Sequence, residues 1–302
     1  MKIKDRIFVA IPDSSLSDEK GLREKTLKIG KFARAFSIFG IKKIIIYKDP
    51  TETRRNSVSL IRLILEFLNT PPYLRKSIYP MNVDLSYTGL LPPIKAPHHK
   101  NKVKLKDISI DEIRMGVLYD RNSIMQQMER NTFTNREILN FKQENFKFYV
   151  NVGLDSPIPF LGEGHNGEKV VVKFINRYPK LKVIRASLKD LENLYFGYSV
   201  VSVGFLEDFF KKLDEKTFVI FTSKKGHLFK SAESQFNKSI TSFENLLIVF
   251  GSPSKGLKEI YPSYHNTKNS LYLNMFPYQK TQTIRLEEAI LGTLTMFNHI
   301  LV

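Results

Sequence analysis

The sequence has 302 residues, which is enough for a sizeable core and for two domains. Lys and Arg number 47 against 30 Asp and Glu, so the formal net charge is +17 and a polyanion is the first partner to consider. The absence of cysteine excludes disulfides and thiolate metal sites, and no apolar run approaches the roughly 18 residues that span a bilayer. The N-terminus carries no secretory segment, so we expect a cytoplasmic protein.

The first ninety residues predict alternating strands and helices. Residues 6–11 and 43–48 are apolar runs typical of buried strands, and apolar residues between 21 and 39 share one helical face. Gly40 is expected to end that helix, and a second helix is expected over 57–68. This order predicts an open parallel sheet with a right-handed crossover.

The composition changes near Pro92, where prolines, His98, His99 and lysines gather. Short strand-like runs then follow at 115–119, 146–152 and 169–175, separated by turn residues, which indicates a small β-barrel. After residue 176 the α/β pattern resumes. We therefore expect a sheet domain made of residues 1–91 and 177–302, with the barrel domain inserted at 92–176.

The C-terminal segment is predicted to carry the ligand site. Strands are expected at 198–203, 218–222, 246–250 and 271–276, helices at 206–213 and 230–240, and a last helix from Ile284 onward. In open α/β sheets, ligands bind outside the carboxyl ends of the strands. The loops at 222–226, 251–256 and 277–283 follow such ends and are rich in Gly, Ser and Thr, which lets backbone groups approach a nucleoside closely. Three ordinary loops that end strands are the alternative.

Other ligand motifs are missing. The segment GSPSKGL at 251–257 lacks the G-x-x-x-x-G-K-[ST] spacing of a phosphate-binding P-loop. The six histidines show no H-E-x-x-H spacing, and the adjacent pair His98 and His99 cannot complete a tetrahedral site. We therefore expect neither nucleoside triphosphate nor metal.

Several segments together resemble one known family. They are AIP at 10–12, KFARAFSIFGI at 31–41, PPYLRK at 71–76, GLLPPIKAPHH at 89–99, RMGVLYD at 114–120, FTSKKG at 221–226, FGSPSKGL at 250–257 and LNMFPYQKTQTIRLEEAIL at 273–291. In order and spacing they resemble the SPOUT, or α/β-knot, RNA methyltransferases, in the archaeal and eukaryotic branch with an inserted OB-like domain. The resemblance implies a trefoil-knotted, Rossmann-like parallel sheet with an inserted OB-like β-barrel.

The same resemblance implies S-adenosylmethionine as the cofactor, held by the three loops mainly through the main chain. It also implies a homodimer, because the last helix is apolar over more than half of its circumference. The substrate is expected to be RNA, foremost ribosomal RNA, with a base nitrogen such as uridine N3 slightly favoured over the ribose 2′-oxygen. The candidate cofactor residues are Thr222, Ser223, Gly226, Phe250, Gly251, Ser252, Gly256, Asn274, Met275, Phe276, Gln279, Thr281 and Thr283.

Arg34 and Arg285 are the candidate catalytic residues, because a guanidinium stabilises an anionic nucleophile and grips a phosphate. Salt-bridged or solvated surface arginines are the alternative. The candidate RNA contacts are Lys142, Lys147, Lys173, His98 and His99. Two other functions stay open, namely a non-catalytic RNA-binding or ribosome-assembly factor and an enzyme of a small anionic metabolite.

Overall fold

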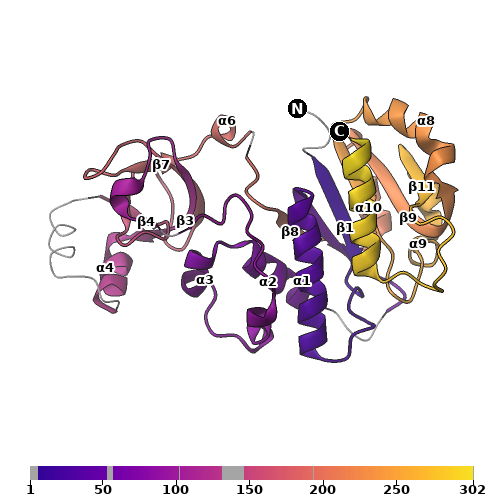
Figure 1. The fold of residues 1–302 in the computed structure, drawn as a ribbon, viewed down its shortest axis with the longest axis horizontal. Helices are drawn as coiled ribbons and strands as arrows, with labels where there is room; N and C mark the ends of the chain where they lie inside the picture. Colours follow the sequence, from indigo (N-terminus) through magenta and orange to yellow (C-terminus); the bar gives the residue numbers. More distant parts are fainter. Residues whose placement is uncertain (1–5, 53–56, 102, 131–145, 193, 302) are drawn as a thin grey trace. The chain divides into compact units, whose positions relative to one another are not determined.

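The computed structural model describes residues 6–52, 57–101, 103–130, 146–192 and 194–301 (Figure 1). These residues form two compact units. The first unit draws on Met1–Asn69, Asn82–Ile94 and Gly197–Val302, and the second on Thr70–Met81 and Lys95–Phe196.

The first unit is built on a six-stranded parallel sheet in the order β11-β9-β10-β1-β2-β8. Strands β1 and β2 come from the start of the chain and the other four from its C-terminal segment, so both segments build one sheet. The central strands are almost wholly apolar because helices cover both of their faces. The prediction of a parallel α/β sheet is confirmed. The strands are β1 (Ile7–Pro12), β2 (Lys43–Tyr47), β8 (Ser199–Ser202), β9 (Thr217–Leu228), β10 (Asn245–Val249) and β11 (Ser270–Asn274).

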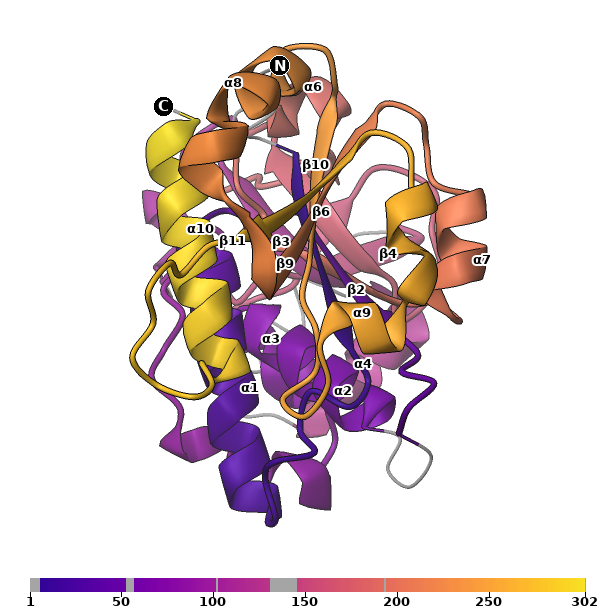
Figure 2. The same ribbon diagram turned by 90° about the vertical axis from the view of Figure 1, so that its right-hand side faces the viewer.

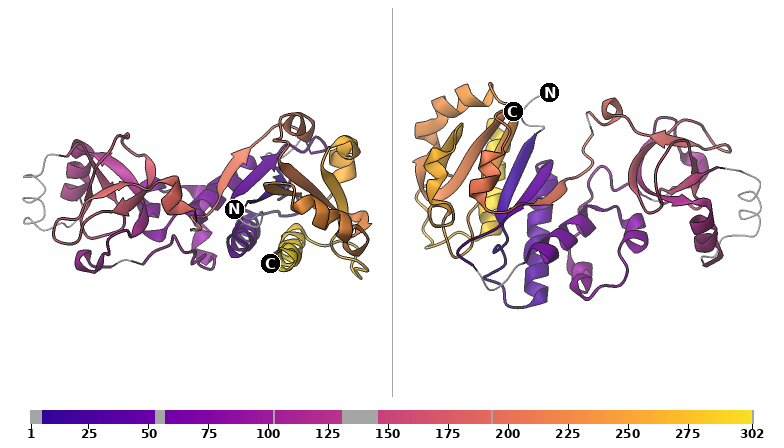
Figure 3. Two further views of the ribbon diagram at one scale, coloured as in Figure 1. Left: turned by 90° about the horizontal axis from the view of Figure 1, so that it is seen from above. Right: turned by 180° about the vertical axis from the view of Figure 1, so that it is seen from behind.

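Two layers of helices enclose this sheet, with α1 and α10 on one face and α7 and α9 on the other (Figure 2). Helices α1 and α10 lie side by side, as the left view of Figure 3 also shows. Gly40 follows α1 with φ +65°, the left-handed conformation that ends helices and that glycine adopts without strain. The helices are α1 (Leu22–Ile38), α2 (Val58–Asn69), α7 (Leu206–Lys211), α8 (Phe229–Ile240), α9 (Leu257–Ile260) and α10 (Leu286–Ile300), with 3₁₀ turns η2 (Val83–Leu85), η3 (Thr88–Leu90) and η5 (Pro262–Asn266).

Strand β9 is longer than predicted, because the expected loop at 222–226 lies within it. Its pairing with β11 nevertheless jumps at this point: Phe221 pairs with Tyr272, whereas His227 pairs with the next residue, Leu273. Residues 222–226 therefore bulge out of register between the two strands. A bulge of this kind re-aims side chains at the rim of a sheet.

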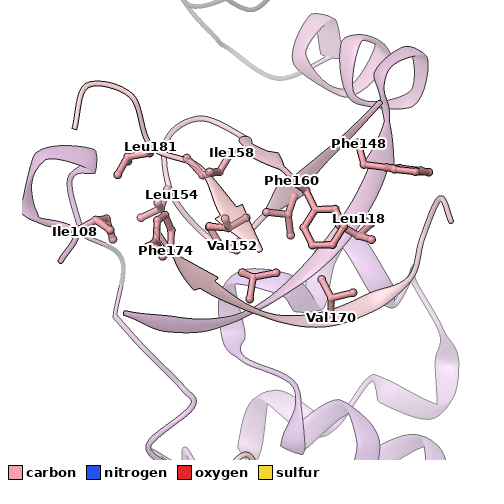
Figure 4. Packing of buried hydrophobic residues seen from close by; sticks show 13 residues of the cluster. Ile108, Leu118, Phe148, Val152, Leu154, Ile158, Phe160, Val170, Phe174 and Leu181 are labelled. Atoms are coloured by element: carbon pink, nitrogen blue, oxygen red, sulfur yellow. The ribbon is translucent and has the colours of Figure 1, made fainter. Parts of the chain in front are cut away.

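The second unit is a closed five-stranded barrel in the order β3-β4-β5-β7-β6, which fits the OB-like barrel predicted for this region. Its interior is filled by aliphatic and phenylalanine side chains, among them Leu118, Phe160 and Phe174 (Figure 4). The elements are β3 (Ile113–Asp120), β4 (Phe148–Asn151), β5 (Ile158–Phe160), β6 (Lys169–Phe174) and β7 (Val183–Arg185), with α3 (Pro72–Ile78), α4 (Arg121–Arg130), α6 (Leu188–Leu191) and η4 (Leu105–Asp107).

The second unit differs from the predicted barrel range of 92–176. Strand β7 lies beyond residue 176 and closes the barrel by pairing with β5 and β6. Helix α3 lies before residue 92 and buries Leu74 against Tyr119 and Tyr149 of the barrel. A three-residue strand and a short helix of two turns carry too little periodicity to be assigned before their tertiary contacts are known.

Candidate functional site

The bulge of β9 and the carboxyl ends of β10 and β11 surround a pocket of about 340 Å³. Parallel strands present their carboxyl ends at one edge, so segments that lie far apart in sequence meet there. The wall combines the bulge of β9, the loop after β10, the loop after β11 and one face of α10. The lining residues are Thr222 to Lys225, Phe250 to Glu259, Tyr272, Asn274 to Phe276, Gln279, Gln282 to Ile284, Leu286, Ala289 and Thr293.

The loop after β10 is a tight turn fixed by Ser252. The Ser252 backbone N–H donates to the Lys255 carbonyl at 3.0 Å, and the Lys255 N–H donates to the Ser252 hydroxyl at 2.9 Å. A Cβ on Gly251 would lie 3.0 Å from the Lys255 carbonyl oxygen, so this turn leaves little room for a side chain there. Gly256 is different, because the nearest described atom that a Cβ would meet there is a Glu259 carboxylate oxygen at 4.0 Å.

A buried tyrosine holds the start of this loop through a hydrogen bond. The Tyr47 hydroxyl, at the end of β2, donates to the Phe250 carbonyl at 2.6 Å. Burial, together with the nearby Asp49 and Asp13 carboxylates, raises the pKa of Tyr47 well above its ordinary value. The phenol therefore keeps its proton and remains a donor.

The loop after β11 is tied to the bulge of β9. The Asn274 side-chain amide donates to the Lys224 carbonyl at 3.0 Å, and the Lys224 ammonium donates to the Gln282 carbonyl at 3.0 Å. At Gly226 the two strands approach so closely that a Cβ would lie 2.4 Å from the Leu273 carbonyl carbon. Glycine is therefore required at this position by strand packing.

The structure brings the predicted cofactor residues together, except for two. Gly226 and Thr281 are not among the lining residues. Gly226 permits the contact between β9 and β11, and the Thr281 carbonyl accepts from the Gln279 side chain at 3.0 Å, which holds the third loop. Both residues therefore help to hold segments of the wall in place without lining the pocket themselves.

Helix α10 supplies a wall that the sequence pattern did not assign to the site. Leu286, Ala289 and Thr293 fall on one face at spacings of three and four residues, which suggested only a packing face. Farther along the helix, Phe297 is buried in its own unit, where it packs against Phe229 and Phe236. Thr293 could have been predicted as a site residue from the sequence, because it places a hydroxyl on an otherwise apolar helix face.

Cationic side chains gather around the pocket mouth. Lys224, Lys225, Lys255 and Lys258 all line it, against a single acidic lining residue, Glu259. The Lys258 ammonium lies 5.1 Å from the centre of the Tyr272 ring, within the range of a cation–π contact. This mouth is suited to an anionic partner.

The two candidate catalytic arginines do not line the pocket. Arg34 lies on α1 and donates to the Pro93 carbonyl at 2.9 Å. Arg285 is the exposed residue before the first turn of α10, and its backbone N–H donates to the Glu288 carboxylate at 3.0 Å. Of the two acids that follow Arg285, Glu288 caps the helix backbone and Glu287 pairs with lysines of α1.

Glu287 joins α10 to α1 in a buried ion-pair network. Its carboxylate lies 3.1 Å from the Lys31 ammonium and 3.7 Å from that of Lys28, which also pairs with Asp18. Burial raises the pKa of Glu287, but its own backbone N–H and the two lysines outweigh this and lower the net pKa. Glu287 is therefore ionised near neutral pH and serves packing of the two helices.

The candidate RNA contacts have different environments. Lys147 is exposed, pairs with Glu163 at 2.8 Å and lies over the Phe148 ring. Lys173 is engaged by Asp190 at 2.7 Å and is mostly covered, so it presents little free charge. Lys142 lies outside the described residues.

The two histidines that were predicted as RNA contacts differ in exposure. His98 is only 1% exposed and packs against His99, Tyr195 and Phe196, with ring centroids 4.4 to 6.1 Å apart. In this structure His98 therefore has almost no surface to offer to RNA. The aromatic residues that cover it lie almost a hundred positions later in the chain. His99 is partly exposed.

Two properties of the described ranges bear on metals and membranes. Within these ranges, no group of three or more His, Asp or Glu side chains is arranged to hold a metal ion. None of the helices in the same ranges combines the length and the apolar character needed to cross a membrane.

Similarity to known proteins extends over most of this chain. A human protein named 28S rRNA (uridine-N(3))-methyltransferase is 26% identical over 319 residues, covering 95% of this chain and 76% of the human one. The Drosophila melanogaster protein of that name is 27% identical, and the chain spans 61% of its length. An uncharacterized protein of Halobacterium salinarum is 26% identical, with 95% of this chain and 96% of that protein covered.

A family model described as "Putative RNA methyltransferase" matches residues 6–297, which span nearly all of the first compact unit and the whole of the second. The chain therefore belongs to this family, and the prediction of an RNA methyltransferase is confirmed.

Proposed function

We propose that this protein transfers a methyl group from S-adenosylmethionine to N3 of a uridine in ribosomal RNA. The proposal rests on one observation: this chain of the RNA methyltransferase family has a pocket lined by β9, β11 and the loops that follow β10 and β11. The choice of uridine N3 rests on the names of the human and fly relatives, which align with 95% of this chain.

The pocket fits an adenosyl ligand. Its volume of about 340 Å³ lies within the range of small-molecule sites, and Phe250, Met275 and Leu286 offer apolar surface to a purine ring. The turn at 251–256 brings backbone groups to the wall, and Thr293 adds a buried hydroxyl without a hydrogen-bond partner among the described residues. Donors and acceptors on an otherwise apolar wall are what an uncharged nucleoside requires.

For methyl transfer the protein mainly has to position the two reactants and stabilise the negative charge that develops on the base. S-adenosylmethionine would supply an electrophilic methyl group on a sulfonium, whose sulfur would become the thioether leaving group as N3 takes the methyl carbon. Uridine N3 carries a proton, which would first have to pass to bulk water so that the N3 lone pair can attack. The positive charge of Lys224 and Lys225 favours the resulting anion and the RNA phosphates beside it, whereas Lys255 is paired with Glu259 at 3.3 Å.

We further propose that the sheet carries the trefoil knot of the SPOUT superfamily and that the chain works as a homodimer. The strand order, with β1 and β10 paired at the centre, is compatible with that topology. Ile38 on α1 and Leu291 on α10 are 58% and 47% exposed, which leaves apolar surface for a second copy. In such a dimer Arg34 would serve the partner's pocket, and the basic barrel would guide RNA.

Calorimetry with S-adenosylmethionine tests the pocket. Gly256→Trp should abolish binding, because its side chain projects into open space at the pocket wall without a backbone clash. Gly204→Trp is the matched control, since a Cβ there meets no described heavy atom within 4 Å and lies outside the pocket; its affinity should equal that of the wild type. Absence of heat with wild-type protein would favour a non-catalytic RNA-binding factor.

Transfer of labelled methyl to ribosomal RNA, followed by mass spectrometry of the nucleosides, tests the reaction. The expected product is N3-methyluridine, and a 2′-O-methyl product would overturn the choice of atom. Arg285→Ala should lower methyl transfer far more than cofactor affinity, because the side chain lies outside the pocket lining. Equal losses would remove Arg285 from the chemistry.

A further inference from the structure

Thr293 has an unusual hydroxyl. The residue is 1% exposed, and its Oγ1 has no hydrogen-bond partner among the residues that the structure describes. Other helical threonines of this chain bond back to the carbonyl four residues earlier: Thr26 to Leu22 and Thr295 to Leu291, each at 2.8 Å. A buried hydroxyl without a partner is costly and calls for an explanation such as a missing ligand.

The position of Thr293 supplies that explanation, because the residue lines the pocket. Leu286 and Ala289 lie seven and four residues before it on the same face of α10, so the surroundings of the hydroxyl on this helix are apolar. The charged lining residues come from other elements, namely β9, the loop after β10 and α9.

These surroundings distinguish between the two halves of the cofactor. The methionyl half carries an ammonium and a carboxylate, which are expensive to bury against an apolar wall. Adenine has two apolar faces and an edge of nitrogen donors and acceptors, and a hydroxyl can donate to or accept from that edge.

We propose that the Thr293 hydroxyl hydrogen-bonds the adenine of the cofactor and so determines specificity for that base. This inference rests on the proposed function, since it takes an adenosyl ligand as the occupant of the pocket. The proposed hydrogen bond orients that ligand with its adenine against α10 and its methionyl end toward the lysines of the pocket mouth.

The test is calorimetry with S-adenosylhomocysteine and with adenosine on the full chain. Thr293→Val replaces the hydroxyl by a methyl group of similar size and should weaken both ligands by the same factor, about threefold to tenfold for one hydrogen bond. Thr293→Ser retains a hydroxyl and should retain most of the affinity. Thr295→Val is the matched control on the same helix, since that side chain is exposed and already bonded, and it should leave both affinities unchanged.

Thermal unfolding without ligand separates binding from a structural role. Because Thr293→Val removes an unsatisfied buried polar group, its unfolding midpoint should equal or exceed that of the wild type while its affinity falls. A lower midpoint together with the lower affinity would assign the residue to packing and overturn the proposal.

Wild-type binding of S-adenosylhomocysteine separates failure of the role assigned to Thr293 from failure of the proposed cofactor. If the wild type binds and Thr293→Val binds equally well, or loses affinity for S-adenosylhomocysteine but not for adenosine, the assignment of Thr293 to adenine is wrong while the proposed function stands. If the wild type binds neither ligand, the proposed cofactor fails and the role of Thr293 fails with it.

Discussion

Replacing Glu287 by glutamine tests whether the ion-pair network stabilises the packing of α10 on α1. The Glu287 side chain is 5% exposed and that of Lys28 is 1% exposed, so this part of the network is desolvated. Lys31 is 61% exposed, and its contact should contribute at most about 1 kcal/mol. The main effect therefore comes from the buried Lys28 ammonium.

The size of the expected loss in unfolding free energy depends on the ion pair that Lys28 retains in the variant. Removing one partner of a buried pair costs about 3–5 kcal/mol when the remaining charge has no other partner. Lys28 retains Asp18, which is 33% exposed, so part of this loss is offset. We expect Glu287→Gln to lower the free energy of unfolding of the sheet unit by about 2–3 kcal/mol.

Urea unfolding followed by circular dichroism, fitted with separate transitions for the two units, measures this difference. Glu288→Gln is the control, because that exposed side chain caps the backbone and its amide oxygen can still accept; the loss there should stay within about 0.5 kcal/mol. A loss for Glu287→Gln no larger than that of the control would refute the reasoning.

The pH dependence provides an independent check. Since the pKa of Glu287 is lower in the folded state, its stabilisation is present above the unfolded pKa and is lost as pH falls through the folded one. The gap between wild type and Glu287→Gln should therefore narrow below about pH 4. A gap that stays constant in acid would exclude the ionised carboxylate as its cause.

Two further substitutions test the support of the pocket. Tyr47→Phe removes the 2.6 Å bond to the Phe250 carbonyl and should lower the free energy of unfolding by about 1–3 kcal/mol, with weaker binding of S-adenosylhomocysteine in calorimetry. Unchanged stability and affinity would show that the loop does not depend on this bond. Gly226→Ala places a Cβ 2.4 Å from the Leu273 backbone and should cost about 1–3 kcal/mol in thermal or urea unfolding, whereas Gly204→Ala should cost little. Equal effects of the two alanines would contradict the close strand contact.

The sequence by itself determined the framework of the sheet unit and the location of two of the loops that line its pocket. Apolar runs such as residues 246–249 predict strands that are buried on both faces, and Gly40 marks a helix end, because both signals arise from neighbouring residues. The loops after β10 and β11 were predicted as a site because parallel strands must present their carboxyl ends together.

Only the tertiary structure decided the details that depend on distant partners. The three residues of β7 have no recognisable pattern until they close the barrel. His98 was predicted as an RNA contact, but Tyr195 and Phe196 cover it in the structure. Glu287 and Lys31 are 256 residues apart, and Thr293 became a pocket residue only when α10 met the loops of three strands. Periodicity records which face of an element is apolar, but the burial of a polar group is set by the atoms that surround it, and those come from other parts of the chain.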